Sequence, residues 1–539
     1  MVIPMFQHRT FWFSRNRFLA AALILAICLS LIGANWGRVE CWNCDNMAFK
    51  EIKPNGLPYD YLKPPLHTYL NYILVMKPAE AIRSILGAEH NFQYQIQLYG
   101  VRFLTLALFC GAITLIYRLT QSLCGTRSAI VLALLTATSA GLIKFNHFGT
   151  ADSPLLFWMI VAFSFAIKAA QSGRIRDSVI AGVLTGLATA DKYNGLCVAF
   201  AIPVALMSFR GWKACFGKQC WVGALTVPLG FVLGTPGAIF DTKNFVQDFL
   251  YNLYTTPVYD GNTSGVGYWD FLKYFPQLIG GPASILIITG YLGSLLLLAR
   301  KRLTQNEMAL LVSAGSVFLY YYITIGRFPR MEDRFVLPAV PFVLLMAAPG
   351  LERIHWERII PAATLSLILV YNIFCSVEVG LLFLSDPKMD AQLFALKNFP
   401  CGAIIENSQA PSWNRLPGLC VTVYNMPLST GRHAWFSKLF GQNPVIKKGV
   451  ERYDSDNYPI DTFTQAGLEK RHPDFIAFSN GAYQYSADEK ARSFYRALGD
   501  GQFGYVKIFD RSCKPRVPWT YPGCTSYVSE RMIILKRQE

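Results

Sequence analysis

Charged residues are scarce in this sequence. Asp, Glu, Lys and Arg together make up 16% of the 539 residues, against about 25% in ordinary soluble domains. The excess of basic over acidic residues forms no stripe with interleaved aromatic side chains, which argues against a nucleic-acid-binding protein. The sequence also lacks internal repeats and low-complexity linkers. No small-x-small cleavage site clearly follows the basic N-terminus and its long apolar run, so we interpret this run as an uncleaved membrane span.

Hydrophobic residues, in contrast, make up 53% of the chain and recur in long runs. This pattern is typical of a polytopic membrane protein, in which each spanning helix needs about 20 apolar residues. We predict about eleven such helices, and we leave open whether 178–209 forms two short spans or one broken span. The predicted ranges are 18–37, 101–118, 128–145, 153–170, 178–190, 195–209, 220–238, 278–299, 308–325, 335–350 and 359–384.

Lys and Arg gather in alternate connections between these segments, which predicts that those connections and the N-terminus are cytoplasmic. The external loops 38–100 and 239–277 and the chain after residue 385 then lie outside the cytoplasm. Some cations in the short external connections break this charge bias and need another explanation. They are Lys144, Lys192, Arg327, Arg330 and Arg334.

The composition changes near residue 386, where long apolar runs give way to short strand-like and helix-like pieces. We therefore predict two domains: an all-α transmembrane module, 1–385, and an extracytoplasmic α/β domain, 386–539. The strand-like pieces are GAIIE, CVTVY, DFIAF, YVKIF and RMIIL, and the helix-like pieces are DAQLFALKNF and ADEKARSFYRAL.

The cysteines on the predicted external side are even in number, as expected for disulfides in an oxidising compartment. Proximity in sequence suggests Cys401 with Cys420 and Cys513 with Cys524. A further candidate pair is Cys41 with Cys44. A zinc site at the latter pair would need two more ligands, which the neighbouring sequence does not supply.

Cations on the predicted external side suit a phosphate at the depth of the lipid headgroups. Lys63 belongs to a stiff Lys-Pro-Pro turn that holds its ammonium near the start of a helix. Arg330 and Arg334 cluster before a later span. The alternative is ordinary snorkelling at the membrane surface, although the charge bias predicts such cations on the cytoplasmic side.

Two carboxylates are expected on the same side. Asp45 follows the first span, and a carboxylate beside bound phosphate can take a proton from a hydroxyl group. Asp152 precedes a Ser-Pro pair that opens a span; the simpler alternative is that Thr150 or Asp152 caps this helix. The combined arrangement predicts group transfer from a lipid phosphate.

The order of several motifs resembles the GT-C fold glycosyltransferases that use polyprenyl-phosphate sugars, in particular the protein O-mannosyltransferase and lipid A aminoarabinose transferase relatives. The motifs are an acidic residue after the first span, then KPPL, GTADSPLLFW, GLATADKYNGL and RFVLPAVP. The resemblance covers about two thirds of the chain, from the first predicted span to the tenth.

The resemblance implies an inverting glycosyltransferase that moves a sugar from a polyprenyl monophosphate to an acceptor hydroxyl outside the cytoplasm. In this scheme, Asp45 is the general base and Lys63 contacts the lipid phosphate. Asp152 orders the site or a metal. Further contacts to the phosphate or sugar are implied for Arg330, Arg334, Tyr61 and His67, whereas Lys192 is expected to be structural.

The sequence departs from the family pattern at two acidic positions. Asn46 stands where many relatives have Glu after the first-loop Asp, and Leu62 stands where some have Glu before the lysine. Because a possible metal ligand is missing, no cofactor is expected to be required; Asp152 is the remaining weak metal candidate. The expected partners are the lipid-linked donor, membrane lipids and an acceptor lipid, glycan or protein.

Two other classes of protein remain open from the sequence. A transporter or flippase of an anionic or lipid-linked substrate would use ionisable groups near the membrane midplane, and Asp191-Lys192 is the feature that fits it. A non-catalytic scaffold with a partner-binding tail is the third. The expected location is the bacterial inner membrane, while the sugar, the acceptor and the oligomeric state are not determined by the sequence.

Overall fold

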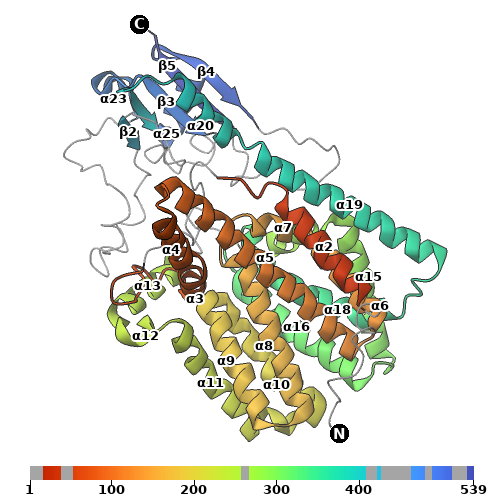
Figure 1. Ribbon diagram of the computed structural model, residues 1–539. Coiled ribbons are helices and arrows are strands. Elements are labelled where there is room, and N and C mark those ends of the chain that lie inside the picture. The colour runs from red at the N-terminus through yellow and green to blue at the C-terminus, as the bar shows by residue number, and fades with distance from the viewer. Residues whose placement is uncertain are drawn as a thin grey trace.

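The computed structural model describes residues 16–37, 52–255, 266–329, 331–407, 422–425, 463–479, 489–512 and 531–538. Within them the chain forms a large helical bundle followed by a small mixed sheet (Figure 1). In the described part of the chain, seven helical segments are long and apolar enough to cross a membrane, or eight if one bent pair counts as a single span. The chain is therefore an integral membrane protein.

Each of the eleven predicted segments overlaps a helix, although the seven or eight candidates leave the exact number of spans a prediction. The bundle helices are α2 (Arg17–Leu31), α5 (His90–Leu123), α6 (Thr126–Ala137), α7 (Ala140–Asn146), α8 (Asp152–Ser172), α9 (Ile175–Asp191), α10 (Ala201–Arg210), α11 (Lys218–Gly234), α15 (Gly281–Ala299), α16 (Gln305–Gly326), α18 (Val340–Glu352) and α19 (Ile359–Leu384).

Shorter helices join these segments. They are α3 (Leu66–Asn71), the π-helix η2 (Tyr72–Met76), α4 (Lys77–Leu86), the 3-10 helices η3 (Tyr193–Phe200), η4 (Trp212–Phe216) and η6 (Leu337–Ala339), and α12 (Gly237–Phe240), α13 (Thr242–Thr255), α14 (Tyr268–Ile279) and α17 (Asp333–Val336). The region 178–209 is thus two helical pieces, because α9 ends before an extended Lys192.

Small residues allow α9 and α11 to pack closely. A Cβ atom added at Gly182 would lie 2.1 Å from the carbonyl oxygen of Gly223, and one added at Gly230 would lie 2.0 Å from that of Val183. Small side chains permit such backbone approach between membrane helices, where packing rather than the hydrophobic effect favours association. The position of Lys192 at the end of α9 is therefore set by a tight helix pair.

Among the described residues after the bundle, five strands form one sheet, and their order is β2-β1-β3-β5-β4. The first three strands in this order are parallel, whereas β5 pairs antiparallel with both β3 and β4. Together with the helical bundle, this sheet confirms the predicted fold class, an all-α membrane protein with a C-terminal α/β domain. The elements are β1 (Ile404–Asn407), β2 (Thr422–Asn425), β3 (Phe475–Ser479), β4 (Tyr505–Arg511), β5 (Met532–Arg537), α20 (Pro387–Asn398), α23 (Gln465–Arg471) and α25 (Glu489–Gly499).

The bundle and the sheet are connected through α20. Asp386 accepts a hydrogen bond from the backbone N–H of Lys388 at 2.9 Å, which caps this helix. Its other oxygen accepts a hydrogen bond from the Trp36 indole at 2.8 Å. The start of α20 is therefore hydrogen-bonded to Trp36, in the connection that leaves α2. Asp386 is also the first residue after the boundary predicted between the two domains.

Among the described cysteines, Cys401 is disulfide-bonded and seven others are free. The remaining disulfide candidates lie outside the described residues: Cys41, Cys44, Cys420, Cys513 and Cys524. The predicted pairings therefore stay predictions.

Candidate functional site

Asp152 is at the centre of a buried polar cluster at the beginning of α8. One of its carboxylate oxygens accepts a hydrogen bond from the Lys192 ammonium at 2.5 Å, and the other accepts one from the Thr150 hydroxyl at 2.8 Å. Lys192 reaches this position because α9 ends at Asp191 and the next residue is extended (φ −154°, ψ 135°). The end of α9 thus places the Lys192 ammonium beside the Asp152 carboxylate of α8 as its counter-ion.

Helix capping does not explain Asp152 or Thr150. The N-cap residue of α8 is Ala151, and among the described residues this helix has no side-chain cap hydrogen bond. The expectation that Thr150 or Asp152 caps the helix is therefore wrong. The Thr150 hydroxyl instead donates to the Asp152 carboxylate, so both side chains belong to the polar cluster.

Lys63 and Arg334 approach the same carboxylate from two other segments. Both interact electrostatically with Asp152, as does Lys192. Arg334 is in α17; its Nε also lies 2.6 Å from a carboxylate oxygen of Glu332, and its guanidinium lies 5.3 Å from the centre of the Phe335 ring. Cations from three segments far apart in the sequence therefore converge on one end of the bundle.

His67 lies beside this cluster and is fully buried in α3. It interacts electrostatically with Asp152 and lies against the backbone at Gly149. Burial lowers the pKa of its imidazole to about 4, so the side chain is neutral at pH 7. His67 packs α3 against the connection that leads into α8, and its predicted contact with a substrate stays a prediction.

Tyr61 fastens the chain just before Lys63. Its backbone N–H donates to Asp248 at 2.9 Å, its hydroxyl donates to Asp241 at 3.3 Å, and its carbonyl accepts from the Tyr193 hydroxyl at 2.9 Å. The side chain is fully buried, and this burial, followed by the charge of Asp241, raises the pKa of the phenol. Tyr61 therefore holds the Lys63 turn against α12, α13 and η3.

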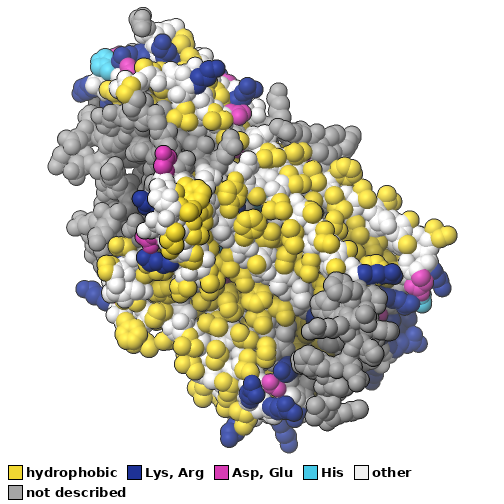
Figure 2. All heavy atoms as spheres, viewed as in Figure 1, with side chains coloured by type: hydrophobic (Ala, Val, Ile, Leu, Met, Phe, Trp, Pro, Cys, Tyr) yellow, Lys and Arg dark blue, Asp and Glu magenta, His cyan; other side chains and the backbone are white. Residues whose placement is uncertain are grey.

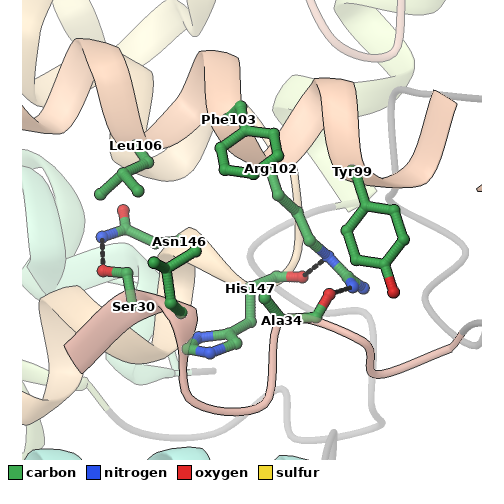
Figure 3. A pocket seen from close by; sticks show the side chains of 9 residues that line it. Ser30, Ala34, Tyr99, Arg102, Phe103, Leu106, Asn146 and His147 are labelled. Atoms are coloured by element: carbon green, nitrogen blue, oxygen red, sulfur yellow. Dashed lines mark hydrogen bonds between the residues drawn. The ribbon is translucent and has the colours of Figure 1, made fainter. Parts of the chain in front are cut away.

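The connection after α2 is fixed by Arg102 of α5. Its guanidinium donates to the carbonyl oxygens of Trp36 at 2.6 Å and His147 at 2.8 Å, and also to that of Ala34. Figure 3 shows Arg102, His147 and Ala34 around a small cavity between α2, α5 and α7. Because His147 lies in the connection that leads to Asp152, one arginine ties that connection to residues 34–36.

The proposed base, Asp45, lies outside the described residues, as does Arg330. The described chain before it ends at Gly37, whose carbonyl accepts a hydrogen bond from the Tyr94 hydroxyl at 2.6 Å. The segment that contains Asp45 therefore follows directly on a hydrogen-bonded residue, Gly37. The role of Asp45 stays a prediction.

In the described part of the chain, no group of three or more His, Cys, Asp and Glu side chains is arranged to hold a metal ion. The two oxygens of Asp152, the weak metal candidate, already accept hydrogen bonds from Lys192 and Thr150. The expectation that no metal is required stays a prediction, because Asp45 lies outside the described residues.

Ion pairs account for most of the cations in the short external connections that broke the charge bias. Lys144 pairs with Asp333 at 2.6 Å, and both belong to segments next to the cluster. Sequence reasoning gave Lys192 only a structural role and did not connect it with Asp152. The available signal was that each of these unexpected cations occurs near acidic residues in the external segments, but the sequence does not show which acid meets which cation.

Comparison with solved structures identifies the fold. The Archaeoglobus fulgidus oligosaccharyltransferase in its apo form superposes with a TM-score of 0.50 at 12% identity, covering 98% of this chain and 89% of that chain. ArnT from Cupriavidus metallidurans bound to undecaprenyl phosphate superposes with a TM-score of 0.50 at 13% identity, covering 98% of each chain. The protein has the GT-C fold of membrane glycosyltransferases.

The sequence itself is similar to one family within this class. The model of the family described as dolichyl-phosphate-mannose-protein mannosyltransferase matches residues 95–235. The match runs from α5 to α11 and includes both Asp152 and Lys192. A search of curated proteins finds no match to the sequence.

Proposed function

We propose that this protein is an inverting glycosyltransferase that moves a sugar from a polyprenyl monophosphate to an acceptor hydroxyl. The observation that carries the proposal is the convergence of Lys63, Arg334 and Lys192 around Asp152 at one end of a GT-C bundle. The family match and the solved structures with the same fold support this class of reaction. A phosphate at the membrane surface is the ligand that such cations suit.

In the proposed reaction, Asp45 takes the proton of the acceptor hydroxyl while the acceptor oxygen attacks the anomeric carbon. The bond from that carbon to the phosphate oxygen breaks on the opposite face, and its electron pair stays with the departing polyprenyl phosphate. Lys63 and Arg334, together with Arg330, stabilise the negative charge that grows on this phosphate. Attack opposite to the leaving group inverts the anomeric centre.

Asp152 has a supporting role in this scheme. Its carboxylate fixes the Lys192 ammonium and the Thr150 hydroxyl, and its charge attracts Lys63 and Arg334. Fixed charges of this kind need little reorganisation as charge develops during the reaction. We assign the site to the extracytoplasmic side of the membrane, on the basis of the charge bias of the connections, and we expect this membrane to be a bacterial inner membrane.

The experiment is an assay of the purified protein in vesicles with labelled polyprenyl-phosphate sugars and a panel of lipid, glycan and peptide acceptors. Transfer of label with release of polyprenyl phosphate supports the proposal. Movement of an intact lipid-linked sugar across the bilayer, with no cleavage at the anomeric carbon, would instead establish the transporter alternative. An excess of EDTA in a parallel reaction measures the metal requirement.

A further inference from the structure

A second cluster of cations lies at the end of the bundle opposite Asp152, because α8 runs from Asp152 to Ser172. We call this cluster the basic end, and it is formed by the connections 170–177, 208–219 and 299–307. These connections are hydrogen-bonded to one another: Arg210 donates to the Ala170 carbonyl at 2.8 Å, and Gln305 donates to the Phe209 carbonyl at 3.1 Å. The basic end is therefore one continuous surface.

Dark blue groups gather at the lower end of Figure 2. Most cations of the basic end are exposed and have no ion-pair partner among the described residues. They are Arg174, Arg176, Lys213, Lys218, Arg300, Lys301 and Arg302. The nearby acidic groups are already engaged. Asp177 accepts from the Ser172 hydroxyl at 2.6 Å, and buried Glu307 pairs with Arg353 at 2.8 Å. The surface is therefore strongly and openly positive.

Large aromatic side chains lie among these cations. Trp212 and Phe216 are 65% and 68% exposed, and their rings meet edge to face with centres 6.0 Å apart. Both belong to η4, which begins after Gly211 (φ 84°). Trp221, in the first turn of α11, is also 60% exposed. Exposed Trp beside Lys is typical of residues at the headgroup level of a membrane.

We propose that the basic end binds the headgroups of anionic phospholipids. Lys and Arg near a membrane surface are attracted to negatively charged lipids, and the attraction is lost within about a Debye length. Lys213 lies between Trp212 and Phe216 in the sequence of η4. The same short helix therefore offers an ammonium group for a lipid phosphate and aromatic rings for the apolar part of the membrane. This is an interaction surface separate from the proposed transferase site.

The aromatic residues favour a lipid surface over an acidic protein as the occupant. An acidic protein would match the cations, but it would not require indole rings directed outward beside the apolar belt of the bundle. The exposed apolar side chains of α11 continue from Trp221 to Leu225 and Leu229, which are 72% and 52% exposed. The cations thus lie where the apolar surface ends, at the depth of lipid phosphates.

The experiment reconstitutes the full chain with spin-labelled phosphatidylglycerol or phosphatidylcholine and measures the fraction of each lipid held by the protein. The wild type should prefer the anionic lipid, and added salt should reduce the preference. The triple variant Lys213→Gln, Lys301→Gln and Arg302→Gln should lower this preference at least about fivefold. Adding inorganic phosphate at the same ionic strength distinguishes a site for the free anion, which phosphate would saturate.

A matched control removes three exposed cations from the sheet domain: Lys397→Gln, Lys470→Gln and Arg496→Gln. An equal loss in this control, or the absence of any preference in the wild type, would overturn the proposal, as would competition by free phosphate. A variant with Lys213→Arg and Lys301→Arg should keep the preference, which guards against a folding defect. Quenching by brominated lipids should also fall in Trp212→Phe, and an unchanged signal would contradict the position of η4.

Discussion

The Lys192 ammonium donates to the Asp152 carboxylate at 2.5 Å, across a separation of 40 residues in the chain. The pair joins the broken end of α9 to the start of α8, and both side chains are largely buried. A buried ion pair is costly to break because the remaining charge keeps its desolvation penalty. The Lys192–Asp152 pair therefore stabilises the fold around the candidate site as well as belonging to the site's chemistry.

Asp152→Asn should destabilise the protein by about 3 kcal/mol, because Lys192 would be left without its bonded counter-ion. Apparent melting temperature in detergent is the measurement. Lys192→Gln should have a similar effect, and the double variant should lose much less than the sum of the two. Additive losses would show that the two side chains do not depend on each other.

Asp191→Asn should be well tolerated, in contrast to Asp152→Asn. Asp191 is fully buried, and neither of its carboxylate oxygens has a hydrogen-bond partner among the described residues. A buried, unpaired carboxylate anion is strongly unfavourable, so replacement by a neutral amide should change stability by about 1 kcal/mol or less. A loss of melting temperature as large as that of Asp152→Asn would contradict this expectation.

The stability of the protein should fall as the pH decreases from about 6.5 to about 4. Burial lowers the pKa of His67 to about 4 in the folded protein, whereas an unfolded histidine titrates near 6.5. Within this window the unfolded state binds more protons, so acid favours unfolding by as much as about 3 kcal/mol. Above pH 6.5 the group is neutral in both states and contributes no pH dependence.

His67→Gln isolates this contribution. The difference in melting temperature between the wild type and His67→Gln should change across pH 4 to 6.5 and be constant above it. His355, which is half exposed and pairs with Glu357 at the surface, offers a matched control in His355→Gln. Parallel pH profiles for the wild type and His67→Gln would remove His67 as the source.

Lys63→Gln should weaken binding of polyprenyl phosphate by about tenfold to a hundredfold, because a hydrogen bond to a charged group contributes about 1.5–3 kcal/mol. The dissociation constant, measured by titration of the purified protein, reports this directly. Lys53→Gln is the matched control, since Lys53 lies in the same external segment but pairs with Asp241 at 3.4 Å. Equal effects of the two substitutions would refute a specific role for Lys63.

Asp45→Asn should reduce turnover about 10²–10⁴-fold, the usual contribution of a positioned base. Donor affinity and melting temperature should stay near those of the wild type. Asp60→Asn provides the comparison, because Asp60 accepts a hydrogen bond from the backbone N–H of Leu62 in the same segment. Near-normal transfer by Asp45→Asn would exclude it as the base.

The predicted fold followed from local patterns, and the structure confirms much of it. Each predicted apolar segment overlaps a helix, and all five predicted strands are present, because run length and alternation depend on neighbouring residues. The short helix α23 was missed: its seven residues are mostly polar and contain little helical periodicity. The break at Lys192 was left open because its position depends on packing between α9 and its neighbours.

The sequence by itself determined a membrane-embedded helical bundle with a small α/β domain, and it placed cations and carboxylates in the connections. Only the tertiary structure decided how these charges combine: Lys192 with Asp152, Lys144 with Asp333, and His67 buried beside them. The physical reason is the sequence separation over which each interaction acts. Hydrophobic periodicity acts over a few residues, whereas a buried charge finds its counter-ion across the fold, at whatever sequence separation the helix packing imposes.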